Sequence, residues 1–77
     1  MHTLRLELEC PDPATARAVR DAVAIESQDG PGGARTWLGL RGAFLVVEVE
    51  AEEDGSLKAA AHGTLRLAEM ALRALAR

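Results

Sequence analysis

The residues best suited to chemistry are basic and lie near the C-terminus, where they recur about every four positions. The series consists of Lys58, His62, Arg66, Arg73 and Arg77. On a helix this spacing would place them on one face, where their charges could contact nucleic-acid phosphates. An ordinary solvated helix face is the alternative, and Glu69 interrupts the series. Because so thin a stripe would bind RNA weakly, we expect it to contribute only within a larger assembly.

Catalytic chemistry has little support in the sequence. His62 has no nucleophile at a fixed spacing. The segment DGPGG at 29–33 lacks the Lys and the Ser or Thr that a phosphate-binding P-loop requires. We therefore expect the protein not to be an enzyme.

Metal ligands and disulfide partners are equally scarce. His2 and His62 are the only histidines, and Cys10 is the only cysteine. A disulfide within the chain is excluded, and no Cys/His cluster of the kind that holds zinc is present. Cys10 is most simply a core-edge residue at the end of a strand. We expect no metal and no cofactor.

The chain has 77 residues, so we expect a single domain over 1–77. A domain this small buries little of its surface and is marginally stable alone. With disulfides and metals excluded, a partner subunit is the expected source of further burial. The net charge of −3 counts against a strongly basic, stand-alone nucleic-acid binder.

Hydropathy gives no sign of a membrane protein. No apolar run approaches the about 20 residues that span a bilayer. The N-terminal MHTLRLELEC alternates and carries charges, unlike a signal peptide. We expect a soluble, cytoplasmic protein.

Hydrophobic periodicity predicts five elements in the order βαββα. Asp12 is the expected N-cap of the first helix and Pro13 its first residue. The expected elements are a strand at 2–10, a helix from 13 to about 25, strands at 34–41 and 43–51, and a helix capped by Asp54 or Ser56 that runs to about 76. The turn-rich segment ESQDGPGG at 26–33 is the expected loop.

This order predicts an α+β fold, with the third strand in the middle of a three-stranded antiparallel sheet and both helices on one face. The first helix has a narrow apolar stripe of Ala18, Val19, Ala22 and Val23, which Ile25 extends.

The last helix carries two apolar stripes. The stripe expected to face the core is Leu57, Ala61, Leu65, Ala68, Leu72 and Leu75. The second, with small side chains, is Ala60, Gly63, Leu67, Met70, Ala71 and Ala74. Gly63 would cost the helix about 1 kcal/mol relative to Ala, which close docking of a partner helix would explain. Packing against the first helix is the alternative.

The sheet face away from the helices carries Trp37, Phe44 and Val46. A two-residue turn at Arg41-Gly42 would place Trp37 opposite Val46. We expect this apolar corner to contact another chain. A half-solvated sheet that Trp37 shields is the alternative. The outer strands lack Pro, so dimerisation through a sheet edge is also possible.

Residues 56–66, SLKAAAHGTLR, resemble the signature of the small dimerising subunit of the KEOPS complex, a family that includes the CTAG-type antigens. The family's last helix opens as Ser-Leu-Arg-Ala and continues with a small residue, Asn-Ser, an aromatic residue and Leu-Arg. The N-terminal LRLELECPDPATARAVRDAV and the later VVEVEAEED are also similar to the family. Lys58, His62-Gly63 and Thr64 replace family residues, which raises the chance of a divergent paralogue that pairs with the standard subunit as a heterodimer. The sequence leaves a homodimer and a heterodimer both open.

The resemblance implies a non-catalytic scaffold. KEOPS makes threonylcarbamoyladenosine in tRNA, and its catalytic subunit is a separate protein of the ASKHA fold. The small subunit docks its helices onto that enzyme, dimerises and supports tRNA binding. A stand-alone nucleic-acid-binding module that uses the basic helix face is the alternative function.

Overall fold

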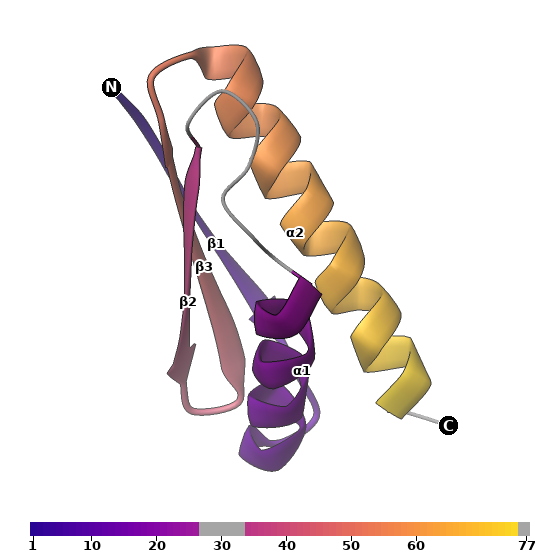
Figure 1. The fold of residues 1–77 in the computed structure, drawn as a ribbon. Helices are drawn as coiled ribbons and strands as arrows, with labels where there is room; N and C mark the ends of the chain where they lie inside the picture. The colour runs from indigo at the N-terminus through magenta and orange to yellow at the C-terminus, as the bar shows by residue number, and fades with distance from the viewer. Residues whose placement is uncertain (27–33, 76–77) are drawn as a thin grey trace.

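The computed structural model describes residues 1–26 and 34–75, which form three strands and two helices. In chain order these are β1 (His2–Glu9), α1 (Pro13–Glu26), β2 (Arg35–Arg41), β3 (Phe44–Ala51) and α2 (Asp54–Leu75) (Figure 1). The predicted order βαββα is confirmed, with boundaries within one or two residues of those expected. The predicted loop lies outside the described residues, apart from Glu26, which ends α1.

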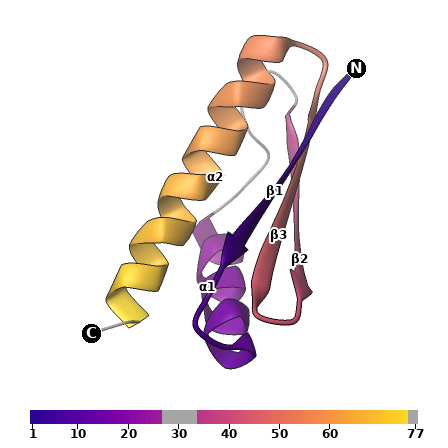
Figure 2. The same ribbon diagram turned by 180° about the vertical axis from the view of Figure 1, so that it is seen from behind.

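The sheet has the strand order β1–β3–β2, and β3 is antiparallel to both neighbours. Figures 1 and 2 show both helices on the same side of this sheet. The predicted α+β architecture is therefore confirmed. β3 is the most buried strand because it is paired on both sides, whereas the inward residues of β1 are only half-buried.

The register of the β2–β3 hairpin differs from the prediction by two residues. Arg41 pairs with Phe44, so the turn consists of Gly42 and Ala43 rather than Arg41 and Gly42. Gly42 has a φ of 60°, a conformation that glycine adopts without strain and that suits the first position of a type II′ turn. Trp37 consequently lies opposite Glu48 and not Val46.

The start of α1 agrees with the sequence. The Thr15 amide donates a 2.7 Å hydrogen bond to Asp12 Oδ1, which is the predicted N-cap interaction. This bond is the main reason that the pKa of Asp12 is lowered.

The buried face of α1 is rotated from the predicted stripe. Val19 and Val23 are buried as expected, and Ala16 joins them, but Ala22 is exposed. Positions 16, 19 and 23 follow the spacing of one helix face, so the stripe begins a turn earlier than predicted. The side chain of Ile25 lies outside the described residues.

The core-facing side of α2 also differs from the prediction. Its buried residues are Leu57, Ala61, Thr64 and Ala68. Leu65 and Leu72 are half-buried, and Leu75 is 49% exposed. In Figures 1 and 2, α2 is nearest the sheet at its N-terminal end and inclines away from it toward the C-terminus. The last turn therefore lies beyond the core that Leu75 was expected to cover.

α2 begins at Asp54, and the Leu57 amide donates the first helical hydrogen bond to the Glu53 carbonyl, so Glu53 is the N-cap. Both predicted caps, Asp54 and Ser56, are therefore wrong because they lie inside the first turn. Lys58 forms a 3.1 Å ion pair with Asp54 one turn earlier.

Candidate protein-interaction surfaces

The second apolar stripe of α2 divides into two groups. Ala60, Leu67 and Ala71 are partly buried and pack against the core cluster. The other three are exposed, and the Met70 side chain is 61% accessible. We call these three, Gly63, Met70 and Ala74, the free strip.

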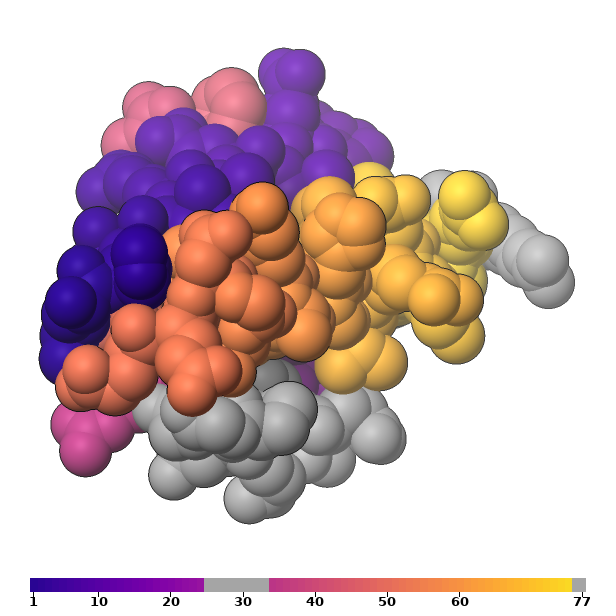
Figure 3. Space-filling view, turned by 90° about the horizontal axis from the view of Figure 1, so that it is seen from above, coloured from indigo at the N-terminus to yellow at the C-terminus, as the bar shows by residue number. Residues whose placement is uncertain are grey.

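Gly63 contacts no other element of the described chain. A Cβ placed on it would meet no neighbouring atom within 4 Å. The interpretation that the small stripe serves packing against α1 therefore does not hold at this residue. Figure 3 shows α2 crossing the whole view, with no other described element over its visible side. Room for an approaching helix is present at Gly63 itself, and Met70 and Ala74 are exposed farther along the same strip.

The basic series of α2 is only partly available for binding an anion. His62, Arg66 and Arg73 are exposed, as predicted for a solvated or RNA-binding face. Lys58 is already paired with Asp54, which reduces the charge it can offer to a phosphate. Arg77 lies outside the described residues.

The open face of the sheet does not form the single apolar corner that was expected. Trp37 is 49% exposed, but Val46 is only 7% exposed although it points away from the helices. Phe44 is half-buried, and the Arg41 guanidinium lies over its ring at 4.8 Å from the centroid. Trp37 and Phe44 are separated along β3 by the row that contains Val46.

An ion pair that crosses β3 accounts for the burial of Val46. Glu7 on β1 lies opposite Val46, and its carboxylate accepts a hydrogen bond from Arg41 on β2. Arg5 also contacts Glu7 at 3.5 Å and Glu48 at 3.9 Å. The hydrogen bond from Arg41 is the main reason that the pKa of Glu7 is lowered. Sequence reasoning missed this network because its members come from three strands.

Cys10 occupies the predicted core-edge position. It is buried beyond the end of β1, and its amide donates a 2.9 Å hydrogen bond to the Ala43 carbonyl. Burial raises the pKa of its thiol, which disfavours the reactive thiolate.

Neither a metal centre nor a membrane span is evident in residues 1–26 and 34–75. No three His, Cys, Asp or Glu side chains of this part of the chain are grouped so as to hold a metal ion. Neither of its helices has the length and hydropathy that crossing a bilayer requires.

These features define a small two-layer α+β protein with an apolar strip on the outer side of its long helix. A family model described as "Transcription factor Pcc1" matches residues 3–76, which is almost the entire chain. The chain therefore belongs to the Pcc1 family, the family of KEOPS subunits, and the resemblance noted from 56–66 is confirmed. Among curated proteins, none matches this chain.

Proposed function

We propose that this protein is a non-catalytic scaffold subunit of a cytoplasmic KEOPS-like complex, which makes threonylcarbamoyladenosine in tRNA. Membership in the KEOPS subunit family supports this role. The observation that carries the docking part is the free strip, where Gly63 leaves open space two turns before the exposed Met70.

The partner proposed for this surface is the catalytic ASKHA-fold subunit, which would present a helix to α2. A helix that approaches over Gly63 would contact the Met70 side chain and bury its exposed apolar surface. Ala60 and Leu67 pack against the core and would form a rigid part of the α2 surface that the partner helix contacts. The remaining basic residues, Arg66 and Arg73, would lie beside it and could contact tRNA within the assembly.

Dimerisation is the second part of the proposal. β1 and β2 are the outer strands of the sheet, so each has an edge that does not pair within the described chain. Pairing of such an edge with a second copy, or with a paralogue, would supply the burial that a small domain lacks. Sedimentation tests this part, since a monomer at tens of micromolar with no paralogue bound would contradict it.

The docking proposal is tested with Gly63→Leu in a pull-down against the catalytic subunit. Because the position is open, the variant should fold, and its thermal unfolding serves as the check. We expect the affinity for the catalytic subunit to fall about fivefold or more, because overpacking of a close contact costs about 1–3 kcal/mol. His62→Ala, the neighbouring exposed position, is the matched control and should bind normally. Equal capture by both variants would refute docking over Gly63.

The nucleic-acid alternative has less support, because the net charge is −3 and Lys58 is already paired. Titration of the isolated protein with tRNA across a salt series separates the two functions. Tight, strongly salt-dependent binding, lost in an Arg66→Gln and Arg73→Gln double variant, would favour the alternative.

A further inference from the structure

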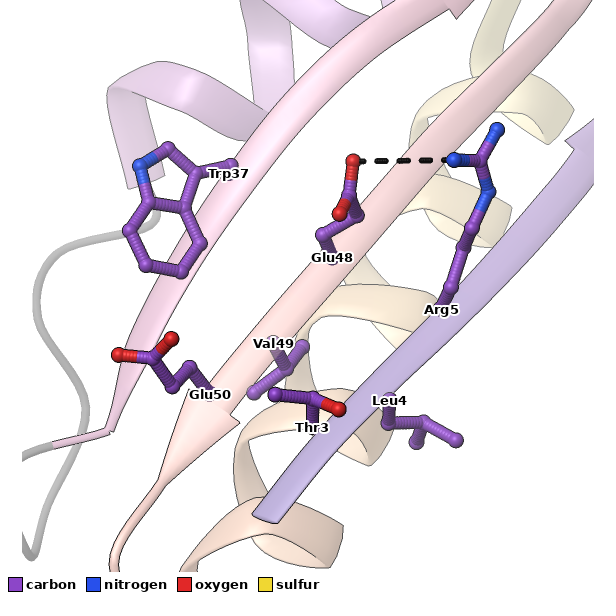
Figure 4. Close-up of a pocket in the computed structure, with 7 residues that line it drawn as sticks. All are labelled: Thr3, Leu4, Arg5, Trp37, Glu48, Val49 and Glu50. Atoms are coloured by element: carbon purple, nitrogen blue, oxygen red, sulfur yellow. Dashed lines mark ion pairs between the residues drawn. The ribbon is translucent and has the colours of Figure 1, made fainter. Parts of the chain in front are cut away.

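A shallow hollow lies on the open face of the sheet, on the side away from the helices and near the strand ends farthest from the hairpin. Its volume is about 140 Å³, and its lining consists of Thr3, Leu4, Arg5, Trp37, Glu48, Val49 and Glu50 (Figure 4). Small-molecule sites usually occupy about 300–1,000 Å³, so a metabolite would not fit in this hollow. The polar end of a single side chain would fit.

The two carboxylates that line the hollow differ in their surroundings. Figure 4 shows Glu48 directed toward Arg5, with which it forms a 3.9 Å ion pair. Glu50 is directed instead toward the indole of Trp37. Within the described residues, Glu50 has no cationic group within 4.0 Å. An unpaired carboxylate beside an exposed aromatic ring can bind a cation, because the carboxylate supplies a negative charge and the ring face attracts positive charge. The Glu50 and Trp37 side chains therefore provide two contacts for a cation that another molecule would bring.

We infer that this hollow receives an arginine side chain from a partner protein. The guanidinium would stack on the exposed Trp37 ring and donate paired hydrogen bonds to Glu50. Arginine suits the site better than lysine because its planar group can satisfy the ring and the carboxylate together. RNA suits it less, because Glu48 and Glu50 would repel phosphates. This surface lies on the face opposite α2, so the inference goes beyond helix docking and does not depend on it.

Arg35 is the residue of this chain that would compete for the site. It pairs with Glu50 across the strands, and its side chain is exposed. No ion pair joins the two within 4.0 Å. If Arg35 folded over Glu50 in solution, its removal would open the hollow, so Arg35→Ala should bind a cationic peptide as well as or better than the unaltered protein.

The experiment uses the full chain, in which Trp37 is the only tryptophan and therefore a specific reporter. The probe is the peptide acetyl-Gly-Arg-Gly-Arg-Gly-amide, followed by tryptophan fluorescence and by the indole N–H resonance. The control peptide has citrulline in place of arginine, which keeps the shape and removes the charge. We expect saturable, salt-sensitive changes with the arginine peptide only.

Variants assign the binding to the hollow. Glu50→Gln should weaken the arginine peptide about two- to fivefold, the range expected for losing one surface ion pair. Glu9→Gln, at the other end of the same face, is the matched control and should bind normally. Equal response to the citrulline peptide, or unchanged affinity in Glu50→Gln, would overturn the inference. A larger fluorescence response to oligouridylate than to the arginine peptide would also overturn it, in favour of RNA.

Discussion

The outer side of α2 and the open face of the sheet both point away from the core, yet they carry apolar residues in different ways. On the sheet, Val46 is covered by an ion pair that crosses from β1 to β2. On α2, Met70 is 61% exposed, and a Cβ on Gly63 would meet no atom within 4 Å. The part of the sheet face around Val46 thus contributes to the stability of the protein itself, whereas Met70, on the outer side of α2, remains exposed in the described chain.

The largest expected difference in the free energy of unfolding comes from introducing an aspartate into each of the two surfaces. Val46→Asp should destabilise the isolated protein by about 3 kcal/mol or more, because a buried charge loses its hydration. Met70→Asp should change stability by less than about 0.5 kcal/mol, as is usual for an exposed position. Urea unfolding of both variants measures the difference. A large loss in Met70→Asp would mean that α2 is covered in the free protein.

Two glycines sharpen the comparison with effects of opposite sign. Gly42→Ala should destabilise the protein by about 1 kcal/mol, because its φ of 60° strains a residue with a Cβ. Gly63→Ala should stabilise it by about 1 kcal/mol, since this glycine lies in a helix and has free space around it. Thermal unfolding of both variants provides the measurement. Destabilisation by Gly63→Ala would show that Gly63 packs within the chain.

The smallest expected effect is a pH dependence that belongs to the sheet face. The pKa of Glu7 is lowered in the folded protein, mainly by the hydrogen bond from Arg41. Its contribution to stability is therefore complete above its unfolded pKa and is lost as the pH falls through the lower folded value. Unfolding midpoints at pH 6, 4 and 3 should decline less steeply in Glu7→Gln. The midpoint of Glu7→Gln should still decline somewhat with falling pH, because the pKa of Asp12 is also lowered in the folded protein. An unchanged slope in Glu7→Gln would exclude this role.

The elements were predictable from the sequence because their signals are local. Asp12-Pro13 determines where α1 begins, and strict alternation identifies β1. The register of the hairpin was not predictable, because it depends on which residue of the turn adopts a positive φ. Gly42 occupies the first turn position, which moves every β2–β3 pair by two residues.

The surfaces were only partly predictable for a different reason. Helical spacing identified the second stripe of α2, but its division into anchored residues and the free strip depends on how α2 inclines across the sheet. Thr64 is buried but was absent from the predicted core stripe, which was drawn from apolar residues alone. The cover over Val46 comes from Glu7 and Arg41, which lie far apart in the chain.

The place of β1 has a consequence for how the chain is made. Among the described strands, β1 pairs only with β3, so Leu6 has no strand partner until Val47 has been synthesised. Until then Leu4, Leu6 and Leu8 have no sheet to pack on. β2, β3 and α2 follow one another directly and can associate through shorter-range contacts. Of these three strands, we therefore expect β1, which is synthesised before the other two, to be the last one placed in the sheet.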